Sequence, residues 1–192
     1  MNSRSLHTQA CRVTWLILVA ILSACSTLTN PLVRMAPDYT EVTVDELRPI
    51  AEQLEGGVAA EIREPTLTNT VETVIDTPEI AQALKSRAAR YQLVQELLDS
   101  GFTMEQLDGK ISILRSGEYK NAYTSAQKDR HALIVISENR DRVLIYESIQ
   151  DANSFSAAGR SAIEEVFSSV RIENLKSGQK YQGPDGEALV KD

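Results

Sequence analysis

Side chains suited to nucleophilic or metal chemistry are scarce in this chain of 192 residues. It contains two cysteines, Cys11 and Cys25, and two histidines, His7 and His131. A cysteine thiolate can attack a carbonyl group, form a disulfide, bind a metal ion or accept an acyl group, and a histidine can serve as a general base. Of these four residues, only Cys25 lies in a sequence context that favours one of these reactions.

The residues before Cys25 have the pattern of a secretory signal. Arg4 and Arg12 make the first dozen residues positive, and residues 13–22 are apolar. This apolar run is about half of the roughly twenty residues that a membrane-spanning helix needs, whereas its length suits a signal peptide. The sequence LSAC, which ends at Cys25, resembles the bacterial lipobox. The resemblance implies that residues 1–24 are a signal peptide that is removed.

The same resemblance implies a lipidated cysteine. In lipobox precursors the thiol receives a diacylglyceryl group and the new amino group is often acylated, for example with palmitate. Each buried CH₂ contributes roughly 0.8 kcal/mol, so two or three acyl chains on Cys25 make a firm membrane anchor. Ser26 follows, as in lipoproteins sorted to the outer membrane. We therefore expect a periplasm-facing, lipid-anchored protein of the cell envelope, in the outer rather than the inner membrane, with residues 25–42 as a flexible lipidated tether.

Processing at this site would remove most of the other reactive side chains. Cys11 and His7 would leave with the signal peptide and Cys25 would be committed to lipid, so we expect no disulfide, no catalytic thiol, no metal site and no cofactor. His131 would be the remaining histidine. The net charge of the whole chain is −7, and loss of the basic signal peptide would make it more negative. This charge opposes binding to nucleic acid.

Helix signals divide the rest of the chain. Residues 43–76 form an acidic N-terminal extension, in which Thr43 opens the sequence TVDE, with the spacing of a capping box that starts a helix. A second helix is predicted to begin after Thr77, an N-cap residue that is followed by Pro78 in the first turn. We expect residues 77–192 to form a helical domain.

The segment 131–153 is ambiguous. Two runs of β-branched residues flank the sequence SENRD and favour a β-hairpin. Placed on a helix, the apolar residues fall on several faces together with Asn139, which describes a helix buried nearly all round. The absence of Gly and Pro between the runs favours a long buried helix near 127–153. The fold class is then mostly α, with minor strands or extended pieces beside the turn signals DG at 108–109 and PDG at 184–186.

Polar residues and glycines stand at fixed spacings in three parts of the chain. They lie in a turn, a long helix and the C-terminal tail: Gly101, Glu105, Asp108, Gly109 and Ile111; Asn139, Arg142, Tyr146, Ile149 and Asn153; Gly178, Tyr181, Gln182, Asp185 and Gly186. In this order they resemble the YdbL-like family of envelope proteins over roughly residues 80–190. The resemblance implies a mostly helical periplasmic domain with an accessory or chaperone-like role in envelope assembly or lipid transport. The chain departs from the family in its lipid anchor, its acidic segment before residue 77 and the lack of an aromatic residue after Asp185-Gly186.

Four side chains are candidates for a binding or a structural role. Arg87 lies on the apolar face of the predicted helix that follows Thr77. There it could bind an anion or, with its stem packed in the core, meet a carboxylate. Asn139, Arg142 and Tyr146 could bind a partner or form internal hydrogen bonds on a central helix.

We expect a non-enzymatic accessory or binding component of the cell envelope, which contacts the membrane through acyl chains on Cys25 and has an envelope protein as its partner. The alternatives are a lipid-anchored periplasmic hydrolase and a structural spacer. A hydrolase would need a carboxylate pair or a serine assisted by His131. However, Glu164 and Glu165 are adjacent on a predicted helix and point apart, and no nucleophile motif surrounds His131. No peptidoglycan-binding signature supports the spacer.

Overall fold

The structure, a computed structural model, describes residues 42–192. The expected signal peptide 1–24, the lipidation of Cys25 and residues 25–41 of the expected tether lie outside the described residues. Val42, the last residue of that expected tether, is buried in the core. Within the described part of the chain, no helix is both long enough and apolar enough to span a membrane.

Both helix starts predicted from capping residues are confirmed. Helix α2 (Val44–Ala59) begins after Thr43, whose hydroxyl accepts a hydrogen bond from Glu46 N at 3.3 Å while the Glu46 carboxylate accepts one from Thr43 N at 2.7 Å. Helix α3 (Pro78–Asp99) begins after Thr77, whose side chain caps the first turn. These side chains satisfy backbone N–H groups that have no partner within the helix.

The ambiguous segment is part of a helix, so the helix prediction is confirmed and the hairpin alternative is wrong. Helix α5 runs over Ser125–Asn153, and its first turn is fixed by a capping box between Thr124 and Gln127. The short helix α4 (Gly117–Ala122) precedes it and helix α6 (Ala157–Glu173) follows it. The fold is mostly helical, as expected.

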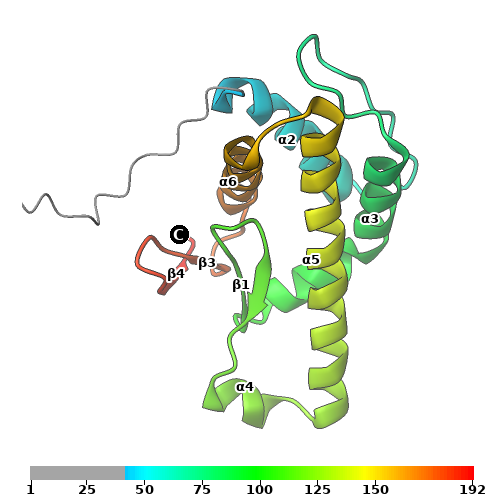
Figure 1. Ribbon diagram of the computed structural model, residues 1–192. Helices are drawn as coiled ribbons and strands as arrows, with labels where there is room; N and C mark the ends of the chain where they lie inside the picture. The colour runs from blue at the N-terminus through cyan, green and yellow to red at the C-terminus, as the bar shows by residue number, and fades with distance from the viewer. Residues whose placement is uncertain (1–41) are drawn as a thin grey trace, which may run out of the picture. The chain divides into compact units, whose positions relative to one another are not determined.

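The expectation that this helix is buried nearly all round is wrong for its first half. Leu133 and Ile136 are 65% and 63% exposed. The cause is the packing of α5, because α3 and the small sheet contact other faces of the helix. In Figure 1 the N-terminal turns of α5 extend past the other long helices, and only α4 lies near their start.

Four short strands form one sheet beside the helices. They are β1 (Thr103–Glu105), β2 (Ile111–Ile113), β3 (Lys180–Gln182) and β4 (Ala188–Val190). The strand order is β2-β1-β3-β4, with β1 antiparallel to β2 and parallel to β3, and β3 antiparallel to β4. Both hairpins turn at the predicted DG and PDG sequences. Their glycines, Gly109 and Gly186, have φ of +78° and +86°, which glycine adopts without steric cost.

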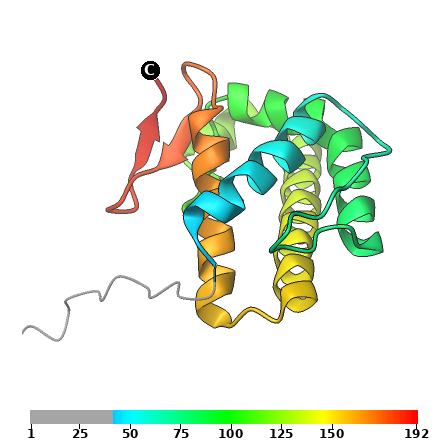
Figure 2. The same ribbon diagram turned by 90° about the horizontal axis from the view of Figure 1, so that it is seen from above.

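The main apolar core lies among α2, α3, α5 and α6. Helix α3 packs along α5, and α2 crosses from α6 towards α3, as Figure 2 shows. Ile50 of α2, Ile149 of α5 and Phe167 of α6 are fully buried members of the same cluster. The segment 43–76, expected as an extension before a domain at 77–192, thus contributes α2 to the same core. Strand β1 contacts α3 and α6, so five elements converge beside this core.

Candidate functional site

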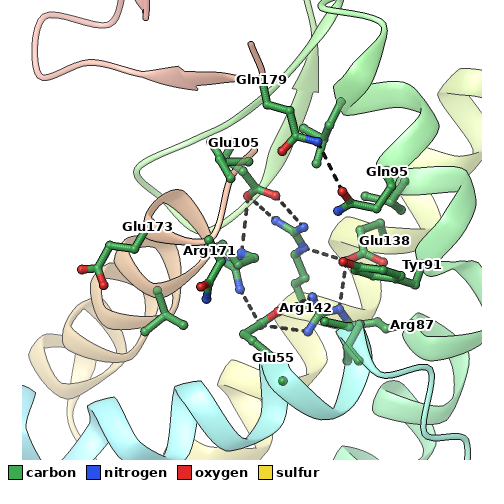
Figure 3. Close-up of a pocket in the computed structure, with 18 of the residues that line it drawn as sticks. Glu55, Arg87, Tyr91, Gln95, Glu105, Glu138, Arg142, Arg171, Glu173 and Gln179 are labelled. Carbon is green, nitrogen blue, oxygen red and sulfur yellow. Dashed lines mark hydrogen bonds and ion pairs between the residues drawn. The ribbon is translucent and has the colours of Figure 1, made fainter. Parts of the chain in front are cut away.

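Three arginines and three glutamates meet in one buried cluster at the point where the five elements converge (Figure 3). None of the six residues is more than 9% exposed. We refer to them together as the charge ring: Glu55 of α2, Arg87 of α3, Glu105 of β1, Glu138 and Arg142 of α5, and Arg171 of α6. Side chains of these types are rarely buried unless they are paired.

The first half of the charge ring is built on two arginines. Arg87 donates from Nη1 and Nη2 to the two oxygens of Glu55 at 3.0 and 2.8 Å, and from Nε to Glu138 Oε1 at 2.9 Å. Arg142 donates from Nε to the same Glu138 oxygen at 2.8 Å. Its Nη1 and Nη2 donate to the two oxygens of Glu105 at 2.6 and 2.9 Å. Each arginine therefore forms a bidentate pair with a carboxylate of its own: Arg87 with Glu55 and Arg142 with Glu105. Bidentate pairing is strong and directional.

Arg171 closes the circle between the two remaining glutamates. It donates from Nη1 to Glu55 Oε1 at 2.7 Å and lies with Nε 3.4 Å from Glu105 Oε2. Its Nη2 donates to Gly109 O at 2.8 Å and to the Tyr146 hydroxyl at 2.6 Å. The Tyr146 hydroxyl in turn donates to Gly109 O at 3.0 Å. Positive and negative groups thus alternate without a gap around the ring.

The order of charges around the ring explains how six ions can share a buried site. Each carboxylate lies between two guanidinium groups, and each guanidinium group lies between two carboxylates. The formal charge of the six side chains sums to zero. Removing ions from water is costly, and the cost is offset only when the pairing geometry is good and the remaining hydrogen-bonding groups are satisfied.

These neighbours keep Glu55, Glu138 and Arg87 ionised at neutral pH. Burial by itself would raise the pKa of Glu55, but the charges of Arg87 and Arg171 lower it to about 2. The pKa of Glu138 is likewise lowered, against the effect of burial, by Arg87 and Arg142. Burial would lower the pKa of Arg87, yet Glu55 and Glu138 raise it well above its ordinary value. A general acid or base works best with a pKa near the operating pH, and the pKa values of Glu55, Glu138 and Arg87 lie far from it.

A second set of charges adjoins the ring on the outer side of Glu138. Arg90 Nη2 donates to Asp141 Oδ2 at 2.6 Å, to Glu138 Oε2 at 3.2 Å and to Ser137 O at 3.3 Å. Arg90 Nε is the one buried side-chain nitrogen or oxygen within residues 42–192 that has no hydrogen-bond partner. Asp141 and Arg90 therefore extend the ionic cluster along the contact between α3 and α5.

The charge ring lines a cavity of about 530 Å³. This volume lies in the range of small-molecule sites. Other parts of the lining are apolar, with Val58, Val94, Leu98, Val170 and Leu175. Gln95 and Gln179 also line it, and Gln179 Nε2 donates to Gln95 Oε1 at 3.3 Å (Figure 3). The same nitrogen donates to Asp99 Oδ1 at 2.7 Å. The cavity thus combines an ionic wall, an apolar wall and a pair of amides.

Three of the four candidates from the sequence come together in or beside the charge ring. Arg87 and Arg142 are ring members, and the guanidinium group of Arg87 meets two carboxylates. Tyr146 supports Arg171 and the β1–β2 turn. Burial raises the pKa of Tyr146, against the opposing charges of Arg171 and Arg142, so its hydroxyl stays protonated and can donate.

Asn139 lies outside the charge ring and binds the backbone of a strand. Its Oδ1 accepts from Ile111 N at 2.9 Å, and its Nδ2 donates to Ile111 O at 2.9 Å. Ile111 belongs to β2, the strand at the edge of the sheet, where backbone groups lack a neighbouring strand. Asn139 takes the place of that strand for one residue and ties the sheet to α5.

Sequence reasoning did not single out the other four ring members as site residues, although two of them, Glu55 and Arg171, carry a signal. Glu55 lies four residues after Ala51 and three before Val58, so it falls on the buried face of α2. Arg171 lies four residues after the buried Phe167 on α6. Charges of both signs at apolar positions of several helices could have indicated a shared buried cluster.

Two ring members carried a weaker signal or none. Glu138 precedes Arg142 by one helical turn, a spacing that allows an ion pair but does not indicate burial. Glu105 lies in a strand of three residues, which is too short for its pattern to indicate which side chains are buried. The place of Glu138 in the ring depends on how α3 packs against α5, and that of Glu105 on how β1 packs against the helices.

The residues considered for a hydrolase lie apart from the ring. His131 Nδ1 is 3.3 Å from the Tyr119 hydroxyl, and its ring packs edge-on against Tyr123. Burial and the charge of Arg130 lower the pKa of His131. Glu164 accepts a hydrogen bond from Arg160 Nε at 2.7 Å. No group of three or more potential metal-ligating side chains occurs within residues 42–192.

No protein-family model, curated protein or solved structure matches this chain. The resemblance to the YdbL-like family stays a prediction.

Proposed function

We propose that this protein is a lipid-anchored accessory component of the cell envelope, and that its folded domain binds another envelope component without catalysing a reaction. The sequence that ends at Cys25 supports the anchor, which places the domain in the periplasm and favours the outer membrane over the inner one. The charge ring and the cavity that it lines support the binding role.

The observation that carries the binding role is the closure of the charge ring. Its guanidinium groups and carboxylates already use each other as hydrogen-bond partners. Burial is outweighed by the charges of Arg87 and Arg171, which hold the pKa of Glu55 at about 2, so this carboxylate neither gives nor takes a proton near neutral pH. A wall of this kind is rigid and chemically quiet, which suits recognition.

The rest of the cavity favours an occupant with an apolar part and a polar end. Its apolar side chains can cover a hydrocarbon group, and Gln95 offers an amide nitrogen to a polar group, whereas both amide atoms of Gln179 are already hydrogen-bonded within the protein. A side chain or a short segment of a partner protein has this chemistry. The overall acidity of the chain disfavours nucleic acid as the occupant.

Gly56 provides a specific test of the cavity. It lies on α2, lines the cavity, and an added Cβ would meet no atom within 4 Å. Gly56→Phe should therefore obstruct the cavity without disturbing the fold, and Gly56→Ala is the matched control. The full chain would be captured from its own envelope in mild detergent, and bound proteins quantified by mass spectrometry. We expect a partner that the wild type and Gly56→Ala retain and that Gly56→Phe loses.

The anchor and the absence of catalysis need separate measurements. Cys25→Ala should give an unprocessed precursor that does not incorporate labelled fatty acid. His131→Ala should change neither lipid labelling nor partner capture. Normal processing of Cys25→Ala would refute the anchor. A hydrolytic activity of the purified chain that His131→Ala abolishes would overturn the binding role.

A further inference from the structure

The N-terminal half of α5 presents an apolar face that the described residues leave open. Leu133 and Ile136 are 65% and 63% exposed, and they are among the most exposed large apolar side chains of the helices. Glu138 and Arg142, which belong to the charge ring, lie on the opposite side of the same helix. Figure 1 shows these turns of α5 running past α3 and α6.

The exposed face has the spacing of a coiled-coil seam. Residues along it alternate in steps of three and four, which keeps them on one side of a helix that pairs with another helix. The seam consists of Ala126, Asp129, Leu133, Ile136, Arg140 and Val143. All six are exposed or half-buried.

The seam is symmetric about a point between residues 134 and 135. Leu133 and Ile136 are equally far from that point, and so are Asp129 and Arg140. A two-fold axis through the point would place a second α5 antiparallel to the first. Leu133 would then face Ile136 of the partner subunit, and Asp129 would face Arg140 of the partner subunit. A two-fold interface requires such self-complementarity, because the same patch serves both copies.

The two charges of the seam are available for this contact. Arg140 has a side chain that is 75% exposed, and its nearest carboxylate oxygen, on Asp141, is 3.4 Å away. Asp141 is already bound by Arg90 at 2.6 Å. Asp129 forms no ion pair with any residue of the range 42–192 that the structure describes.

We propose that two copies of this chain pair through the N-terminal halves of their α5 helices. Leu133 and Ile136 form the centre of the contact, and Asp129 and Arg140 form an ion pair with the partner at each end. The seam is about 26 Å long at 1.5 Å per residue, which is short for a stable interface. The dimer should therefore be weak and should form with rising concentration. This proposal is independent of the cavity and its occupant.

A charge-swap series tests the pairing and its direction. The protein mass of the full chain in mild detergent would be measured by sedimentation equilibrium over the widest soluble concentration range. Asp129→Arg and Arg140→Asp each place like charges together at both ends of the contact, so each should raise the dissociation constant by about tenfold. The double variant Asp129→Arg/Arg140→Asp restores both pairs with the signs exchanged, so it should dimerise like the wild type.

Two further variants separate the seam from general effects of charge. Leu133→Asp puts a charge at the centre and should give a monomer at all concentrations, with an unchanged circular dichroism spectrum because the side chain is exposed. Asp151→Arg reverses an exposed charge of α5 outside the seam and should leave the dissociation constant unchanged. A wild type that is monomeric throughout, as it would be if a different protein covers this face, overturns the proposal. So does a dimer that the single reversals leave intact, or one that the double variant fails to restore.

Discussion

Replacement of Arg142 should show how far the fold depends on the charge ring. Arg142 donates to Glu138 at 2.8 Å and to both oxygens of Glu105 at 2.6 and 2.9 Å. In Arg142→Met the side chain stays unbranched and apolar along its stem, but it is shorter and loses all of these donors. Glu105 then retains one contact from the guanidinium groups, the 3.4 Å approach of Arg171 Nε.

The expected cost follows from leaving a buried charge without its partner. Breaking a buried ion pair by removing one side costs about 3–5 kcal/mol. Arg142 serves two carboxylates, so we expect Arg142→Met to lie at the upper end of that range. The free energy of unfolding of an ordinary domain is about 5–15 kcal/mol, so this loss is a large part of the total stability.

A second substitution should recover much of this loss. Arg142→Met/Glu105→Met removes one positive and one negative member, so Glu55 and Glu138 remain balanced by Arg87 and Arg171. Replacing both partners of a buried pair by apolar side chains is often neutral. We expect the double variant to be more stable than the sum of the single variants predicts by at least about 2 kcal/mol.

Urea unfolding followed by far-ultraviolet circular dichroism would measure these free energies. Arg130→Met is the matched control, because Arg130 is an exposed arginine of the same helix and should change stability by less than about 0.5 kcal/mol. The dependence of the free energy on urea should be the same in all variants. A cost of Arg142→Met below about 1 kcal/mol, or additivity of the two substitutions, would refute the reasoning.

Three further predictions concern other parts of the fold. The lowered pKa of Glu55, about 2 against an ordinary 4.5, contributes stability that is present above pH 4.5 and is lost as the pH falls towards 2, a loss of roughly 3 kcal/mol in acid unfolding titrations. Asn139→Ala should cost about 2 kcal/mol and speed amide exchange at Ile111, which Asn139 clamps. Gly57→Ala, in open space on α2, should raise the thermal midpoint through a gain of roughly 0.5–1 kcal/mol.

The helix starts could be predicted because their causes are local. Thr43 and Thr77 cap N–H groups within three residues of themselves, so the sequence contains both partners. The helical state of 131–153 was likewise favoured by the sequence, because the absence of Gly and Pro between its apolar runs disfavours a tight hairpin turn. The exposure of Leu133 and Ile136 was not, since it depends on which elements pack against α5.

For the same reason, most of the charge ring could not be predicted from the sequence. Arg87 on an apolar face signals a buried charge, but its partners lie 32 and 51 residues away in the sequence. Arg171 and Glu55 are separated by 116 residues. A single sequence can therefore suggest that a charge is buried and still give no indication of which opposite charge it meets.

The closed circuit of charges also bears on how the domain opens. Its six members come from five elements. Detaching α2, α3, α6 or the sheet alone would remove one charge from the ring and leave an uncompensated charge of the opposite sign in the interior. Partly unfolded forms should therefore be strongly disfavoured. The backbone amides of the ring residues should exchange slowly, because their exchange requires global unfolding. Chain segments more than one hundred residues apart must be in place before the last pair forms. The helices and the strand that carry the ring would then resist proteolytic cleavage until the domain unfolds as a whole.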